Sequence, residues 1–199
     1  MIALIDYGAG NLTSVRKAFR ALGADVMTPQ APSELSGVRG IVVPGVGHFG
    51  ATATIDDKWR RTIREAVDRD VALLGICLGM QWLYERSAEA PTLAGLGVFE
   101  GCCERFAPDG AALKIPHVGW NLLDEPRDAG LMSGVAAQSQ VYFTHSYFAP
   151  VTPDTAATTT YGQTFAAAAE RGRIAGVQFH PEKSGETGLH ILRNWIRAL

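Results

Sequence analysis

Apolar and polar positions alternate in blocks through the first half of the chain. Four apolar runs predict buried strands: residues 2–8, 25–28, 40–50 (broken at Pro44) and 71–76. Three segments predict helices, two of them with apolar residues at helical spacing: 11–23, 59–70 and 78 to about 88. Gly23 occupies the position that commonly ends a helix. This order of elements favours a largely parallel sheet covered on both faces.

From about residue 97 the pattern changes to short runs rich in aromatic and β-branched residues. Three such runs predict antiparallel strands: 98–106, 114–123 and 140–150. Segment 164–182 predicts two more strands, although its alanine run 166–169 would suit a helix by propensity alone. Segment 187–199 predicts a closing helix. The expected fold over residues 1–199 is therefore one α/β domain, with a mostly parallel central sheet, helices on both faces and an antiparallel C-terminal extension.

Composition and charge narrow the classes of protein to consider. Of the 199 residues, 47% are hydrophobic and 19% charged, with a net charge of −2, which fits a globular domain without a basic surface for nucleic acid or anionic lipid. No apolar run reaches the roughly 18 residues of a membrane span, and the N-terminus shows no secretion signal. The cysteines are Cys77, Cys102 and Cys103, an odd set that fits a reducing cytoplasm. Without CxxC or HxxxH spacing, no metal site is expected.

The junction between the strand at 71–76 and the following helix carries the first candidate for chemistry. Its sequence, Gly-Ile-Cys-Leu-Gly at 75–79, has the spacing of a nucleophile elbow, where glycines permit a sharp turn and the central residue projects from the sheet edge. A helix N-terminus would favour a thiolate at Cys77, and the Leu78 amide would face the same space as an oxyanion donor. The alternative is a small buried cysteine at a glycine-lined strand end.

A nucleophile of this kind needs a base and a group that orients the base. His180 directly follows an apolar run, and Pro181 restricts it to an extended conformation. Residues i and i+2 of an extended chain face the same way, so the Glu182 carboxylate can reach the His180 ring. An ordinary histidine at a strand end is the alternative. His117, which begins a loop, and His190, on the closing helix, are expected to be structural.

Two glycine-rich stretches are less specific. Gly45, Gly47 and Gly50 follow a strand and would expose backbone amides, but an ordinary turn has the same composition. The stretch 6–15 suggests a dinucleotide fingerprint, yet Thr13 stands at its third glycine position, where close helix–strand packing needs glycine. The dinucleotide interpretation is therefore disfavoured.

Taken together, "GICLGMQ" (75–81) and "FHPE" (179–182) resemble the class I glutamine amidotransferases, which use a catalytic triad. Four further stretches, "DYGAGN", "PGVGHFG", "KIPHVGWN" and "VYFTHSYF" in this order, resemble a narrower group, the glutaminase subunits of imidazole glycerol phosphate synthases. The resemblance extends from Asp6 to Ser184, which is almost the whole chain.

The resemblance implies a reaction and a set of site residues. Cys77 would attack the side-chain amide of glutamine to form a thioester, His180 would move the proton, and Glu182 would hold His180. The implied substrate-binding residues are Gly47, Leu78, Gly79, Gln81, Thr144, His145 and Ser146. No cofactor or metal is implied.

The resemblance also implies a partner. Free ammonia would be lost to water, so the glutaminase would form a heterodimer with a (β/α)8-barrel cyclase in the cytoplasm. The cyclase converts the ribulosyl nucleotide PRFAR and ammonia to imidazole glycerol phosphate and the carboxamide ribotide AICAR in histidine biosynthesis. Trp120 and Tyr142 would anchor this interface, with ordinary core packing as the alternative.

Two other functions remain open from the sequence. The chain could be the glutaminase subunit of another synthase, such as anthranilate or aminodeoxychorismate synthase, although "KIPHVGWN" argues against this. It could instead be a non-catalytic binding or redox module of the same fold. The presence of all three triad residues argues against that second alternative.

Overall fold

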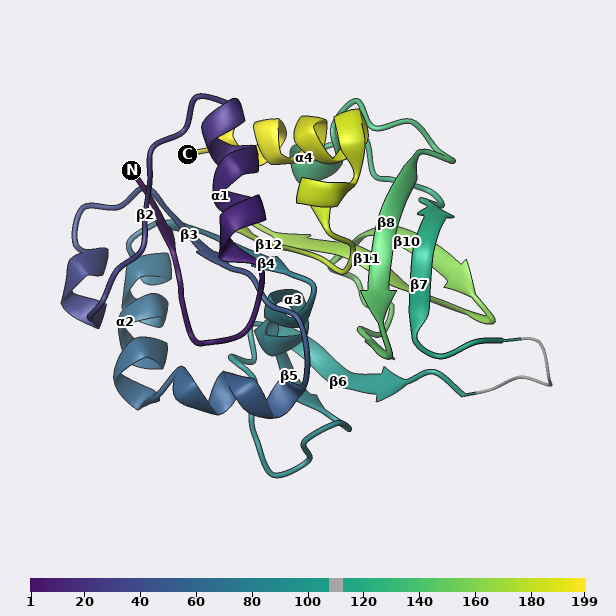
Figure 1. Cartoon of the computed structure of the whole chain (residues 1–199), viewed down its shortest axis with the longest axis horizontal. Coiled ribbons are helices and arrows are strands. Elements are labelled where there is room, and N and C mark those ends of the chain that lie inside the picture. Colours follow the sequence, from purple (N-terminus) through teal and green to yellow (C-terminus); the bar gives the residue numbers. More distant parts are fainter. Residues whose placement is uncertain (108–112) are drawn as a thin grey trace.

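The computed structural model describes residues 1–107 and 113–199, and a seven-stranded sheet forms its centre (Figure 1). Five strands are parallel, in the order β12 (Ile174–Val177), β4 (Ala72–Ile76), β3 (Gly40–Val43), β1 (Ile2–Leu4) and β2 (Val26–Met27). Next to β12 the antiparallel strands β11 (Gln163–Arg171) and β10 (Thr155–Tyr161) extend the sheet. The predicted mostly parallel sheet with an antiparallel extension is confirmed, although β10 was not among the predicted strands.

Helices cover both faces of this sheet, as the sequence predicts (Figure 1). Helices α1 (Leu12–Ala21) and α4 (Gly185–Arg197) pack on one face, where the rings of Phe19 and Trp195 meet edge-on at 5.8 Å. Helices α2 (Asp57–Asp68) and α3 (Leu78–Leu83) pack on the other, with Ile63 of α2 fully buried. Within the described ranges, none of the helices has the length and apolar character that crossing a membrane requires.

Local capping explains where the first two helices begin and end. The Asn11 side chain accepts a hydrogen bond from the Ser14 amide at 3.2 Å, and Asp56 accepts from the amides of residues 58 and 59 at 3.0 Å. These bonds satisfy amide groups that lack partners inside a helix. Gly23 follows α1 with a φ of +77°, the left-handed conformation expected at a helix end. Both helices are therefore specified largely by the sequence around them.

Two smaller sheets lie beside the main one. One contains β5 (Tyr84–Ser87), β6 (Phe99–Arg105) and β9 (Tyr147–Phe148), and the other contains β7 (His117–Leu122) and β8 (Gln140–His145). The predicted antiparallel pairing is confirmed for β6 with β9 and for β7 with β8, while β6 also pairs in parallel with β5. The predicted run 140–150 is divided into β8 and β9 at Ser146.

Helix α3 is shorter than the sequence suggests. It ends at Leu83 rather than near residue 88, and the chain continues directly into β5. The Leu83 carbonyl accepts from the Val98 amide at 2.9 Å, and the Tyr84 carbonyl accepts from the Gly97 amide at 3.1 Å. A loop distant in sequence thus occupies carbonyls that would otherwise continue the helix.

The alanine run 166–169 lies inside β11, as predicted against its helix propensity. All four residues are fully buried, and β11 is paired with β10 on one side and β12 on the other. Pairing and burial on both faces of the sheet therefore override the intrinsic preference of alanine for a helix.

Candidate active site

Cys77 lies at the sharp turn between β4 and α3. Its φ and ψ are +53° and −106°, an unusual backbone conformation for a residue other than glycine. The Cys77 amide donates to the Val177 carbonyl at 2.7 Å, which holds the turn against β12. A Cβ atom at Gly79 would lie 1.7 Å from the Val43 carbonyl oxygen, and one at Gly75 would lie 2.6 Å from the Gly79 oxygen. The two glycines therefore let α3 approach β3 and β4 closely enough to form the elbow.

His180 and Glu182 form a buried pair three to five residues after β12, where the chain makes a 3-10 turn at Pro181–Lys183 and not the extended segment that the sequence predicts. The distance between His180 Nδ1 and Glu182 Oε1 is 2.8 Å, and the two side chains are only 3% and 2% exposed. The His180 amide donates to the Tyr142 carbonyl at 2.9 Å, and the Ser184 hydroxyl donates to the His180 carbonyl at 2.6 Å. His180 Nε2 is buried and has no hydrogen-bond partner in the described part of the chain. Glu182 thus orients a ring whose other nitrogen is open for proton transfer.

The charges around His180 favour its protonated form. Burial by itself lowers the pKa of His180, but Cys77 and the Glu182 carboxylate outweigh burial and raise that pKa to about 10. Near neutral pH the imidazole therefore keeps a proton when Cys77 is a thiolate. The Glu182 carboxylate therefore supports the imidazolium form of His180.

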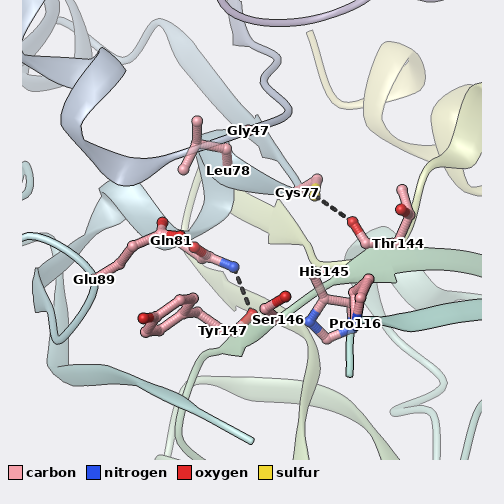
Figure 2. Close-up of a pocket in the computed structure, with 10 residues that line it drawn as sticks. All are labelled: Gly47, Cys77, Leu78, Gln81, Glu89, Pro116, Thr144, His145, Ser146 and Tyr147. Carbon is pink, nitrogen blue, oxygen red and sulfur yellow. Dashed lines mark hydrogen bonds between the residues drawn. The ribbon is translucent and has the colours of Figure 1, made fainter. Parts of the chain in front are cut away.

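The Cys77 sulfur opens into a cavity of about 250 Å³ (Figure 2). The residues around it are Gly47, Cys77, Leu78, Gln81, Glu89, Pro116, Thr144, His145, Ser146 and Tyr147. Six of the seven substrate-binding residues inferred from the sequence are in this group. Gly79 is the exception, because it packs against β3 at the base of the elbow.

Three residues at the cavity were not singled out from the sequence: Glu89, Pro116 and Tyr147. Pro116 and Tyr147 belong to stretches that carry the family resemblance, so a signal for them was present. Glu89 lies in an undistinguished loop after β5, and its carboxylate accepts from the Phe49 amide at 2.6 Å. Only the tertiary fold brings this negative charge to the cavity wall.

The Leu78 amide, expected to be an oxyanion donor, has a partner already. It donates to the Gly45 carbonyl at 3.4 Å, a long bond. Gly45 is packed tightly, since a Cβ there would lie 2.0 Å from the Tyr7 hydroxyl, while Gly47 lies exposed with a φ of +103°. In this conformation the Gly45 carbonyl competes with any oxyanion for the Leu78 amide.

His145 at the cavity wall is paired with His117. His145 Nε2 lies 3.2 Å from His117 Nδ1, and the His117 ring stacks between Phe143 and Tyr161, with centroids at 4.8 Å and 4.0 Å. Burial lowers the pKa of His117 to about 4 and that of His145 to about 3, so both rings are neutral near pH 7. His117 begins strand β7 rather than a loop, which corrects the sequence prediction.

Trp120 and Tyr142 lie on neighbouring strands outside the core. Trp120 is 55% exposed and its ring meets that of Tyr142 edge-on at 6.0 Å. Val118, two residues before Trp120 on β7, is 56% exposed, and Lys183 Nζ lies 5.7 Å from the centre of the Tyr142 ring. We call Val118, Trp120 and Tyr142 the apolar patch. Since the Tyr142 carbonyl accepts from the His180 amide, this patch adjoins the triad.

Comparison with known proteins identifies relatives along the whole chain. Residues 3–199 match the family described as glutamine amidotransferase class-I. The HisH subunit of imidazole glycerol phosphate synthase from Moorella thermoacetica is 43% identical, over 98% of this chain and 93% of that protein. The HisH subunit from Methanothermobacter thermautotrophicus is 42% identical, over 100% of this chain and 99% of that protein. The chloroplastic hisHF protein of Arabidopsis thaliana is 37% identical over 98% of this chain, which spans 34% of that longer protein.

Solved structures share the fold at lower identity. A glutamine amidotransferase crystal structure superposes with a TM-score of 0.76 at 20% identity, covering 100% of this chain and 98% of that one. The PurLQS structure from Thermotoga maritima gives a TM-score of 0.75 at 18% identity, covering 98% of this chain and 97% of that one. These two similarities support the fold alone.

Proposed function

Since the chain belongs to the class I glutamine amidotransferases, and within them to the HisH subunits of imidazole glycerol phosphate synthase, we propose that Cys77, His180 and Glu182 carry its glutaminase reaction. The reaction releases ammonia from glutamine for histidine biosynthesis. The HisH relatives favour this function over that of a glutaminase subunit of another synthase. The observation that carries the residue assignment is the strained Cys77 elbow beside the buried His180–Glu182 pair.

The proposed reaction has two halves. The Cys77 thiolate attacks the side-chain carbonyl carbon of glutamine, and the carbon–nitrogen bond breaks as His180 gives its proton to the departing ammonia. A γ-glutamyl thioester remains on Cys77. His180 then removes a proton from water, the hydroxide attacks the thioester, and glutamate leaves as the thiolate forms again. Glu182 keeps His180 Nε2 facing these reacting atoms by binding Nδ1–H.

The cavity offers complementary groups for the rest of the substrate. Glu89 supplies a carboxylate at the wall, which suits the α-ammonium group of glutamine. Backbone and hydroxyl groups of residues 144–146 lie on another side of the cavity and suit the α-carboxylate (Figure 2). A cavity of about 250 Å³ fits a small amino acid better than a nucleotide.

The partner in this proposal is the (β/α)8-barrel cyclase subunit HisF. The exposed apolar patch adjoins the triad and is the surface proposed to meet it, with Trp120 as its centre. The Arabidopsis relative, of which this chain spans about a third, fits an arrangement in which a second unit accompanies the glutaminase.

Trp120→Ala is expected to weaken binding to the cyclase about tenfold or more in a titration. Val151→Ala, also at an exposed apolar residue, is the control and should leave affinity unchanged.

Replacement of the nucleophile tests the assignment most directly. In the complex with the cyclase, Cys77→Ala should abolish glutamine hydrolysis while the cyclase still makes product from added ammonium salts. The second activity shows that the cyclase in the assay is intact, and gel filtration of the mixture shows that the variant still binds it. Glutamine hydrolysis by the Cys77→Ala complex at a rate near wild type would exclude the covalent mechanism.

A further inference from the structure

A buried glutamine outside the triad contacts the Cys77 sulfur. Gln178 follows β12, is fully buried, and places Nε2 3.7 Å from Cys77 Sγ. It does not line the substrate cavity. In the described part of the chain, the sulfur also contacts the Thr144 carbonyl oxygen, at 3.9 Å. Apart from His180, its polar neighbours are therefore one amide side chain and one backbone carbonyl.

The direction of the Gln178 amide is set by a backbone carbonyl that can only accept. The Tyr147 carbonyl lies 2.7 Å from Gln81 Nε2, so the NH2 group of Gln81 must point toward it. The same NH2 group lies 3.1 Å from Gln178 Oε1 and gives it the second hydrogen. With its oxygen committed to Gln81, Gln178 presents N–H and not C=O to the sulfur.

The two neutral histidines complete the other end of this chain of hydrogen bonds. His145 Nδ1 lies 2.8 Å from the same Tyr147 carbonyl and must therefore donate to it. His145 Nε2 is then an acceptor and takes the hydrogen of His117 Nδ1 at 3.2 Å. His117 Nε2 in turn accepts from Asn121 Nδ2 at 3.3 Å. Both rings have to be neutral for this order, in agreement with their burial.

The orientation of the Gln178 amide matters because a thiol and a thiolate are stabilised by different neighbouring groups. A thiol can donate weakly to the Thr144 carbonyl, but a thiolate has no hydrogen to give and faces that oxygen unfavourably. The Gln178 N–H is a donor to the sulfur and favours the thiolate. A reversed amide would place a second oxygen against the negative charge.

We propose that Gln178 is a catalytic residue that stabilises the Cys77 thiolate, and that the Tyr147 carbonyl fixes the direction of the Gln178 amide through Gln81. This proposal rests on Cys77 being the nucleophile of the proposed function. Its readout, the reactivity of the sulfur itself, does not depend on glutamine turnover, so the two can fail separately.

The test is the alkylation rate of Cys77 across pH in Gln178→Met, a change that keeps the length of the side chain and removes its donor. Timed exposure to iodoacetamide, with the Cys77 peptide quantified by mass spectrometry, separates this thiol from Cys102 and Cys103. At pH 7 alkylation should slow about tenfold, the effect of losing one hydrogen bond to a charged group, and the pH profile should move upward. In the cyclase complex kcat for glutamine should fall while KM changes little, because Gln178 does not line the cavity.

Gln163→Met is the matched control, the same change at an exposed residue where β11 begins, and it should alkylate as wild type does. An unchanged rate in Gln178→Met would overturn the proposal and leave Gln178 as a packing residue. If Gln178→Met does not fold, Gln178→Glu tests the role of Gln178 instead, because a carboxylate still accepts from Gln81 but repels the thiolate. That variant should slow alkylation more than tenfold, and wild-type reactivity would contradict the proposal.

Discussion

At the scale of single residues, His180, His145 and His117 are all buried, and burial disfavours the charged imidazolium of each. His180 lies beside Cys77 and Glu182, whose negative charges reverse the effect and raise its pKa to about 10. The rings of His117 and His145 have each other, the Asn121 side chain and the Tyr147 carbonyl as partners, all of them uncharged, and the pKa of each stays low. One residue type therefore acts as a proton carrier in one place and as a neutral hydrogen-bonding link in another.

The low pKa of His117 and of His145 predicts that acid destabilises the protein. Because these values, about 4 and about 3, lie below the ordinary value of 6.5, the unfolded chain takes up protons first as pH falls. The free energy of unfolding should drop between pH 7.5 and 5 by about 2 kcal/mol for each histidine. The raised pKa of His180 acts in the opposite sense: its stabilisation is present below pH 6.5 and is lost progressively as pH rises from 6.5 through about 10, so it offsets part of the drop.

Urea unfolding at the two pH values measures this effect. His48→Asn, at an exposed site, is the control and should leave the difference between the two pH values as in wild type. Equal unfolding free energies at pH 7.5 and pH 5 in the wild type would contradict the assignment of neutral, buried rings.

At the scale of elements, parallel pairing brings the candidate residues together. Strands β3, β4 and β12 are adjacent and run in the same direction, so their carboxyl ends lie at one edge of the sheet. The glycine-rich stretch after β3, Cys77 after β4 and His180 after β12 all follow these ends. The site therefore depends on how closely α3 packs against β3 and β4.

Gly79→Ala tests that close packing. The added methyl group would lie 1.7 Å from the Val43 carbonyl oxygen, and backbone on both sides leaves no side chain to move aside. We expect a loss of about 3 kcal/mol in the free energy of unfolding, at the upper end for overpacking, and slower glutamine turnover as Cys77 shifts. Gly50→Ala, where the methyl would meet only the His48 side chain, should be nearly neutral in thermal unfolding. Equal melting temperatures for the two variants would show that α3 can move without cost.

At the scale of the whole molecule, the apolar patch on β7 and β8 and the stretch Gly45–Gly47 after β3 both adjoin the triad. Tyr142 of the patch binds the His180 amide through its backbone, and the Gly45 carbonyl occupies the Leu78 amide in the free chain. A docked partner can therefore alter the site only if it binds one arrangement of these elements better than the other.

From this we predict that the free subunit hydrolyses glutamine slowly and that the cyclase, with a nucleotide analogue bound, accelerates it. An absent oxyanion donor costs on the order of 10²-fold in rate. Gly45 and Gly47 can adopt either sign of φ, so a peptide in this stretch can turn over when the partner docks. The measurement compares glutamine turnover by the free subunit, the complex and the liganded complex. A free subunit as fast as the liganded complex would mean that the donors are already in place.

The sequence by itself determined the features that depend on neighbouring residues. Periodicity and caps specify α1 and α2, and the two glycines around Cys77 specify the elbow. The contact between Glu182 and His180 is also as predicted, although a 3-10 turn at Pro181–Lys183, and not an extended chain, brings the two side chains together. Each of these follows from the conformations that a few adjacent residues can adopt, so a sequence pattern suffices to predict them.

Only the tertiary structure decided the features that join distant residues. The end of α3 is set by a loop more than ten residues further along the chain, and Glu89 reaches the cavity through the Phe49 amide, 40 residues away. Gln81 and Gln178, 97 residues apart, meet only because α3 and the end of β12 pack together. Local propensity carries no information about such pairs, since the sheet order that brings them together comes from burial of the whole core.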